Sequence, residues 1–160
     1  MIQACCQAFS IAPALNARIE NLQYQQTEQI DLGIAVDRDA TLYCPVISNA
    51  QTKTRATLRT ILDRIKTHPH NAQETSPSFV LSNIGMIAGL FATPLVISPS
   101  VATLAVGRRH QQPVVLNNGD IAPQTILPLS LSFDHRCVTG ADAARFLAAF
   151  LNAIEAPNGT

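Results

Sequence analysis

The sequence has 160 residues with 11 basic and 11 acidic side chains, so its formal net charge at pH 7 is zero. This balance leaves no basic excess to attract a nucleic acid or an anionic membrane, and no apolar run reaches the roughly 18 residues of a membrane-spanning helix. The length predicts one domain with a continuous core. Because 47% of the residues are hydrophobic and only 14% are charged, we expect other subunits to cover part of the surface.

The first half of the chain is expected to alternate between helix and strand. Residues 1–9 lack the charged segment of a signal peptide and predict a short helix, so the cytoplasm is the expected compartment. Strands are expected at 17–24, 30–36 and 42–47, followed by a helix from about Thr54 to Lys66. The apolar residues of that helix fall on one side, and its charges are typical of a solvated outer face.

Residues 67–77 form the one linker-like stretch of the sequence, and they contain His68 and His70. Two nearby histidines suggest a metal site. However, no third ligand is close in the sequence, and the prolines indicate a loop. We therefore expect no metal there.

The second half of the chain predicts more strands and a final helix. The strands are expected near 78–82, 102–107, 112–116 and 123–134, with 117–120 as a hairpin turn, and the helix is expected from about Ala141 to Ile154. This order of elements predicts the α/β class, as a two-layer α+β sandwich in which helices pack on one face of a mixed sheet.

His135 is the strongest candidate for chemistry. Leucine and phenylalanine alternate with polar residues from Leu127 to Phe133, which predicts a strand with one buried face that ends beside the histidine. Thr139 and Asp142 have the spacing of a capping box that opens the last helix, with Gly140 in the turn. A neutral imidazole there can accept a proton from a thiol or hydroxyl, although most histidines in this setting are structural.

Ser82 is the second candidate, because it lies where a strand ends in Ser82-Asn83-Ile84-Gly85. Its hydroxyl can point into a pocket while Asn83 and Gly85 shape the turn, or it can simply cap that turn. Arg108 and Arg109 follow a strand directly and are weaker candidates for binding the phosphates of a ligand. An exposed hairpin is the favoured explanation for them.

The four cysteines form no C-x-x-C pair, so a metal site or a disulfide framework is not expected. Reduced, mostly buried thiols are the favoured interpretation. Cys137 follows His135 by two residues, which leaves a cysteine nucleophile as an open alternative.

Several motifs in order along the chain resemble the catalytic core of the dihydrolipoyl acyltransferases of 2-oxoacid dehydrogenase complexes, which are distantly related to chloramphenicol acetyltransferase. The segment from Phe133 to Gly140 resembles the family's His-Arg-x-x-Asp-Gly active-site signature. Further matches cover nearly the whole chain: Pro13 to Ala17, Asp31 to Val36, Tyr43 to Ile47, Phe79 to Gly85, Pro94 to Pro99 and Ala102 to Gly107.

The resemblance implies a chloramphenicol acetyltransferase-like fold and acyl transfer between dihydrolipoamide and coenzyme A. It gives His135 the role of general base and Ser82 that of a donor to the oxyanion, with Thr139, Asn83 and Gly140 as supporting residues. Coenzyme A is then a substrate, another domain or chain supplies the lipoamide, and no metal is needed. The family forms trimers that build larger cores, and its sites lie between subunits, so other subunits of the complex are possible partners.

Two departures from the family pattern leave alternatives open. Thr139 replaces the acidic residue of the signature, and the family's catalytic domain normally begins before the segment matched by Met1. The sequence also carries no lipoyl domain and no peripheral-subunit-binding domain, so residues 1–160 read as one N-terminally shortened core domain. The alternatives are a non-catalytic, core-forming homologue and a free-standing acetyltransferase that uses acetyl-coenzyme A.

Overall fold

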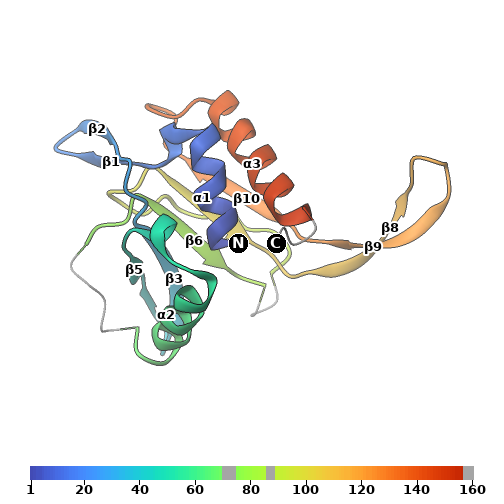
Figure 1. The fold of residues 1–160 in the computed structure, drawn as a ribbon, viewed down its shortest axis with the longest axis horizontal. Helices are drawn as coiled ribbons and strands as arrows, with labels where there is room; N and C mark the ends of the chain where they lie inside the picture. Colours follow the sequence, from blue (N-terminus) through green and yellow to red (C-terminus); the bar gives the residue numbers. More distant parts are fainter. Residues whose placement is uncertain (70–74, 86–88, 157–160) are drawn as a thin grey trace.

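The computed structural model describes residues 1–69, 75–85 and 89–156, and it is built on a six-stranded mixed sheet (Figure 1). The strand order is β10-β7-β6-β3-β4, and β5 also pairs with β3. Parallel pairing joins β3 (Leu32–Arg38), β6 (Phe79–Asn83) and β7 (Ala102–Val106). The antiparallel strands are β4 (Thr41–Tyr43), β5 (Val46–Ile47) and β10 (Leu129–Phe133).

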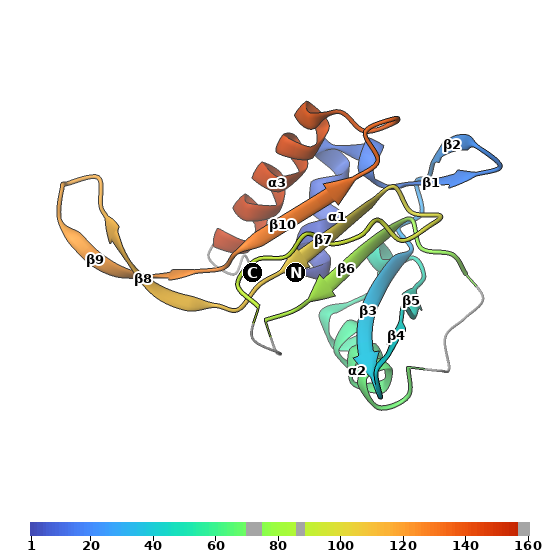
Figure 2. The same cartoon turned by 180° about the vertical axis from the view of Figure 1, so that it is seen from behind.

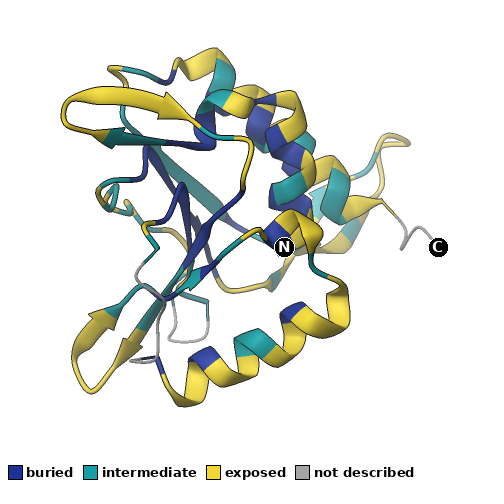
Figure 3. Cartoon of the chain, turned by 60° about the vertical axis from the view of Figure 1, so that its left-hand side comes forward, coloured by how far each residue is buried: buried dark blue, intermediate teal, exposed yellow. Residues whose placement is uncertain are grey.

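Two helices, α1 (Ile2–Ile11) and α3 (Gly140–Glu155), lie side by side on one face of this sheet (Figures 1 and 2). Phenylalanines fill the space between the layers: the ring centroids of Phe9 and Phe79 are 5.1 Å apart, and those of Phe79 and Phe146 are 5.2 Å apart. All three residues are buried. Figure 3 shows the buried residues gathering where these helices meet the sheet. The core is therefore closed on the helix side.

The helix α2 (Arg55–Thr67) lies beside β3, and short 3-10 helices occupy Pro13–Leu15 and Ala50–Thr52. Thr54 caps α2, because its hydroxyl accepts a hydrogen bond from the Thr57 amide at 3.2 Å. The predicted inner face is found: Leu58 and Ile65 are buried. Among the described residues, no helix is long and apolar enough to cross a membrane.

Two separate hairpins project from opposite ends of the molecule's long axis (Figures 1 and 2). One pairs β1 (Ala17–Glu20) with β2 (Gln23–Gln26), and the other pairs β8 (His110–Val115) with β9 (Ile121–Ile126). In the second hairpin Pro113 lies directly opposite Pro123. Proline has no N–H to give to the ladder, so this is a position without cross-strand hydrogen bonds.

The predicted fold class is confirmed, as are the three predicted helices and the strands at 30–36, 78–82 and 102–107. The predicted hairpin turn at 117–120 is also confirmed: the Gly119 amide donates to the Leu116 carbonyl at 2.9 Å, and the Leu116 amide donates to the Asp120 carbonyl at 2.7 Å.

Three predicted strands were wrong in extent. The segment 17–24 turns back at Asn21 and Leu22, whose φ angles are 52° and 64°. The segment 42–47 divides before Pro45, and 123–134 divides before Pro128, where the chain passes from a hairpin into the sheet. Proline explains the last two breaks because it cannot donate to a ladder. The break in 17–24 could not be predicted in this way, because that segment contains no glycine or proline.

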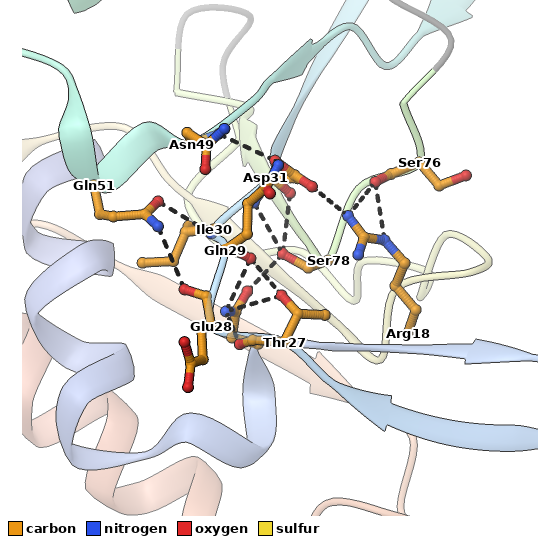
Figure 4. Close-up of polar contacts among 11 residues, drawn as sticks. Arg18, Thr27, Glu28, Gln29, Ile30, Asp31, Asn49, Gln51, Ser76 and Ser78 are labelled. Carbon is orange, nitrogen blue, oxygen red and sulfur yellow. Dashed lines mark hydrogen bonds and ion pairs between the residues drawn. The ribbon is translucent and has the colours of Figure 1, made fainter.

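A buried polar network ties β1 to the sheet (Figure 4). Arg18 Nη2 donates to Asp31 Oδ2 at 2.6 Å and to the Ser76 carbonyl at 2.7 Å. Asp31 Oδ1 accepts from Gln29 Nε2 at 2.9 Å and from the Asn49 amide at 3.1 Å. The carboxylate is therefore satisfied on both oxygens although Asp31 is only 3% exposed.

Candidate active site

His135 lies in the turn that follows β10, as predicted. The turn is held by the Asp134 carbonyl, which accepts from the Cys137 amide at 3.2 Å and from the Val138 amide at 3.0 Å. The imidazole is exposed, and its centroid lies 5.4 Å from that of Phe133. It makes no hydrogen bond to any of the described residues. Neither ring nitrogen is therefore occupied by a described residue of this chain.

The residues on either side of His135 bind each other. Arg136 donates from Nη2 to Asp134 Oδ2 at 2.6 Å and from its amide to Oδ1 at 3.0 Å. The hydrogen bonds from Arg136 lower the pKa of Asp134 from 3.8 to about 2. The Asp134 carboxylate therefore stabilises the turn through Arg136, and it does not orient the His135 imidazole.

Thr139 forms the predicted capping box with Asp142. Its amide donates to Asp142 Oδ2 at 3.2 Å, and its hydroxyl accepts from the Asp142 amide at 3.1 Å and donates to the same carboxylate at 2.6 Å. The hydrogen bond from the Thr139 hydroxyl, followed by those from Arg145 and the Thr139 amide, lowers the pKa of Asp142. Gly140 is the first residue of α3, with open space where a Cβ would be. The Thr139 hydroxyl is therefore engaged in starting α3.

Ser82 lies on β6, directly opposite Ala35 on one side and Ala105 on the other. Ala105 in turn lies opposite Ser130, so a row of small side chains crosses four strands. Leu81 and Phe79 point into the helix-covered core, and hence Ser82 points to the other face. Its hydroxyl is half-buried and makes no hydrogen bond to the described residues. It is available to a ligand.

Asn83 shapes the turn after β6, as predicted, because its Oδ1 accepts from the Gly85 amide at 3.1 Å. Its side chain projects toward the helix side and lines a cavity of about 760 Å³ between α2 and the sheet. Most of the other lining residues are apolar, and the charged ones are Asp37, Arg55, Arg59 and Lys66. Ser82 does not line this cavity, so the side chains of Asn83 and Ser82 lie on opposite faces of β6.

Ser82 and His135 lie far apart within one chain. Ser82 is level with Ser130, three residues before Phe133, and β6 and β10 are separated by β7. At about 3.3 Å per residue and about 4.8 Å per strand, Ser82 lies roughly 10 Å along and 10 Å across from Phe133, and His135 is two residues further. A single copy therefore does not bring the two predicted groups to one reacting centre.

Arg108 and Arg109 lie at the base of the β8–β9 hairpin, at the end of the sheet that carries Ser82. Both are exposed, and the Arg108 amide donates to the Gly89 carbonyl at 2.8 Å. Neither guanidinium forms an ion pair with a described carboxylate. Both guanidinium groups are therefore exposed and unpaired within the described part of the chain.

Burial disfavours the thiolate form of the cysteines. Burial raises the pKa of Cys5 to about 12 and that of Cys44 to about 11, and it also raises the pKa of Cys137. The Cys137 thiol donates to the Asp134 carbonyl at 3.5 Å. A thiolate is therefore disfavoured next to His135 at neutral pH.

The histidine pair does not form a described metal site. His68 lies at the end of α2, where its Nδ1 is 2.9 Å from the Thr67 hydroxyl, and His70 lies outside the described residues. Within the described part of the chain, no three His, Cys, Asp or Glu side chains are grouped closely enough to hold a metal ion.

Comparison with known proteins gives one family. The model of the 2-oxoacid dehydrogenases acyltransferase (catalytic domain) matches residues 1–160. A similar curated protein is the dihydrolipoyllysine-residue acetyltransferase component of the pyruvate dehydrogenase complex of Buchnera aphidicola subsp. Schizaphis graminum. It is 40% identical over 123 residues, which cover 74% of this chain and 30% of that protein. The chain spans about a third of the length of the curated relatives it matches.

Two solved structures are similar to this chain in both sequence and fold. The dihydrolipoamide acetyltransferase of Azotobacter vinelandii, studied for the role of a serine, a histidine and an asparagine in its catalytic mechanism, has a TM-score of 0.86 and 29% identity over 96% of this chain and 68% of that chain. The cubic core of a pyruvate dehydrogenase multienzyme complex has a TM-score of 0.82 and 30% identity with the same coverage.

A chloramphenicol acetyltransferase, 13% identical, covers 93% of this chain and 73% of its own with a TM-score of 0.55, which shows a shared fold alone. The expected fold likeness is thereby confirmed. Because the family model covers the whole sequence and the relatives above share both sequence and fold with it, the chain belongs to the family of 2-oxoacid dehydrogenase acyltransferase catalytic domains.

Proposed function

We propose that this chain catalyses acyl transfer between dihydrolipoamide and coenzyme A, with His135 as general base and Ser82 as donor to the oxyanion. The family match over residues 1–160 carries the proposal. The lipoyl group would come from another domain or chain, and the chain would work inside a trimer or a larger core of a 2-oxoacid dehydrogenase complex.

The spacing of the two residues supports their roles. In the Azotobacter vinelandii enzyme the serine precedes the histidine by 52 residues, and the asparagine follows the histidine by four. Here Ser82 precedes His135 by 53 residues, and Thr139 follows it by four. Thr139 thus occupies the position of that asparagine, as a residue whose hydroxyl already caps α3.

The chemistry needs only a base and a hydrogen-bond donor. The neutral His135 imidazole removes the proton from the attacking thiol, and the resulting thiolate adds to the carbonyl carbon of the thioester. The Ser82 hydroxyl donates a hydrogen bond to the oxyanion of the tetrahedral intermediate. When the intermediate collapses, the C–S bond to the other thiol breaks, and the imidazolium returns its proton to that sulfur.

The separation of Ser82 from His135 in one copy leads us to place the site between two copies. The two residues sit toward opposite ends of the sheet. If the Ser82 end of one copy meets the His135 end of the next, both groups can reach one thioester. A monomer is then expected to be inactive, and each site of an assembly combines residues from two chains.

The decisive experiment uses the chain carrying His135→Ala, the chain carrying Ser82→Ala, and their co-expressed mixture. Each variant alone should lose acyl transfer from acetyl-coenzyme A to dihydrolipoamide by roughly a hundredfold or more. In random mixed assemblies about a quarter of the sites pair an intact Ser82 with an intact His135, so the mixture should regain about a quarter of the wild-type rate.

The matched control is wild-type chain mixed with either variant, which reports the statistics of mixing. A mixture of the two variants that stays as inactive as each variant alone would contradict the shared site. Full activity of the His135→Ala chain would contradict the role of His135 itself. Light scattering on the same fractions records whether the assemblies are unchanged.

The alternative is a non-catalytic chain that only builds a core, and the engaged hydroxyl of Thr139 favours it. In that case the purified assembly shows no acyl transfer for His135→Ala to remove. Turnover of acetyl-coenzyme A without lipoamide would instead identify a free-standing acetyltransferase.

A further inference from the structure

We propose that the cavity between α2 and the sheet holds an acidic amphipathic helix that a partner protein supplies. The cavity has a volume of about 760 Å³, which lies in the range of ligand-binding pockets. It opens on the helix-covered face of the sheet, whereas Ser82 points to the other face. The acyl transfer proposed above does not use this surface, so the two sites are separate.

The cavity has an apolar lining on two sides. Leucine, isoleucine and valine side chains line it, from the sheet at Ile34, Val36 and Leu81 and from α2 at Leu58, Leu62 and Ile65. The first residues of α1 also border it. Ordered water needs polar partners, which such a lining does not offer. An apolar occupant therefore fits this space.

The helix α2 is not packed closely against the rest of the chain. Most of the stability of a helix in a protein comes from the packing of its apolar face. The helices α1 and α3 lie side by side, whereas α2 stands apart from them (Figures 1 and 3). It packs extensively on no described helix or strand. Its apolar face is therefore available to a further helix.

Basic side chains follow one flank of that apolar face. Arg55, Arg59 and Lys66 line the cavity, and by helix geometry they fall within about 40° of one another around the axis of α2 and span roughly 16 Å along it. Arg59 pairs with Asp63 at 3.2 Å. Neither Arg55 nor Lys66 forms an ion pair with a described carboxylate. Against them the lining has one acidic residue, Asp37, so the rim is positive.

The length of this basic flank favours a helix over a small amphiphile. A fatty acid has one carboxylate, and a single cation would satisfy it. An amphipathic helix with acidic residues on successive turns can face cations roughly 16 Å apart, which is about three turns. Its apolar side chains at i, i+3, i+4 and i+7 would enter the cavity, as in other helix-in-groove complexes.

A second copy of this chain does not offer such a helix. The helix α1 has no charged residue, and α2 is itself basic. The apolar face of α3 is buried in the core through Phe146 and Phe150. Among the described helices, none combines a free apolar face with an acidic flank. The occupant is therefore a helix of a different protein.

The test titrates the full chain into a fluorescently labelled synthetic peptide of about eighteen residues, with binding measured by fluorescence anisotropy. The peptide carries leucine at i, i+3, i+4 and i+7 and glutamate along one flank of that face. Lys66→Glu is expected to weaken binding about tenfold, because it places a repulsive charge beside the cavity. Arg64→Glu is the matched control. It also reverses a charge in the last turn of α2, but about 180° away from Arg55, and it should leave binding unchanged.

A second peptide, with lysine in place of glutamate, tests the charge requirement directly. It should bind the Lys66→Glu chain more tightly than the wild type. Leu62→Gln makes the lining polar and retains a good helix former, so it should weaken binding of the acidic peptide while the far-ultraviolet circular dichroism stays unchanged. An acidic peptide that does not bind the wild type, or that binds Lys66→Glu and Arg64→Glu equally well, would overturn the proposal.

Hydrogen exchange then locates the bound peptide. The amides of α2 should exchange more slowly in the complex, and binding without this protection would contradict the site. Dodecanoate is tested in the same way. Protection of α2 by dodecanoate but not by the peptide would identify a small amphiphile as the occupant and contradict the helix. Neither measurement depends on acyl transfer, so failure of the proposed function would leave both results unchanged.

Discussion

Arg18 and Asp31 form an enclosed ion pair, with Nη2 and Oδ2 2.6 Å apart and side chains that are 15% and 4% exposed. The pair joins β1 to the start of β3, and so it fixes the β1–β2 hairpin relative to the sheet. The position of this hairpin relative to the sheet therefore depends on a contact that is largely closed to water.

Removing the Asp31 carboxylate should destabilise the fold. Asp31→Ala leaves the Arg18 guanidinium without its counter-ion in a largely buried setting, and it takes acceptors from Gln29 and Asn49. We expect the free energy of unfolding to fall by about 3 to 5 kcal/mol, measured by urea denaturation. The double change Arg18→Met with Asp31→Leu should recover part of the loss. A fall below about 1 kcal/mol would show that water satisfies Arg18.

Thr139 should contribute to stability through its cap. Thr139→Ala removes the hydroxyl that accepts from the Asp142 amide, and we expect a loss of about 1 kcal/mol in the free energy of unfolding. Thr139→Asn, which places asparagine at the position four residues after the histidine, should stay close to the wild type because asparagine also caps helices. Equal losses for alanine and asparagine would argue against the cap.

The pair of Asp134 and Arg136 should make stability depend on acidity. Because the pKa of Asp134 falls from 3.8 to about 2 in the folded state, the ionised carboxylate stabilises the fold above about pH 4, and this contribution is lost as the pH falls toward 2. Wild type should therefore exceed Asp134→Asn in unfolding free energy at pH 6, and the difference should shrink by pH 2.5. A difference that stays constant over this range would count against the pair.

Gly85 should be intolerant of a side chain. A Cβ there would lie 2.6 Å from the Gly107 carbonyl oxygen and 2.8 Å from the Arg108 Cα, so the Ser82 turn and the base of the β8–β9 hairpin would have to move apart. We expect Gly85→Ala to cost about 1 to 3 kcal/mol. Gly140→Ala is the control, since no atom lies within 4 Å of the added Cβ and it should be neutral in thermal unfolding.

The sequence predicted what local patterns encode. The alternation before His135, the spacing of Thr139 and Asp142 and the turn at 117–120 all depend on neighbours within a few residues, and the structure has each of them. The family likeness, read from motifs along the whole chain, also held.

The features that the sequence did not predict depend on long-range contacts. The predicted strand at 30–36 includes Asp31 but does not indicate its ion pair, because the partner Arg18 belongs to another element. The cavity beside α2 and the distance between Ser82 and His135 both follow from strand order and register, which periodicity does not determine.

The opposed prolines of the β8–β9 hairpin bear on solubility. A projecting ribbon has two open edges, and each edge could recruit strands from other chains without limit. Pro113 and Pro123 remove an outward-facing N–H from each edge at the same level of the ribbon. At that level of the ribbon, neither edge can donate a hydrogen bond to a strand of another chain.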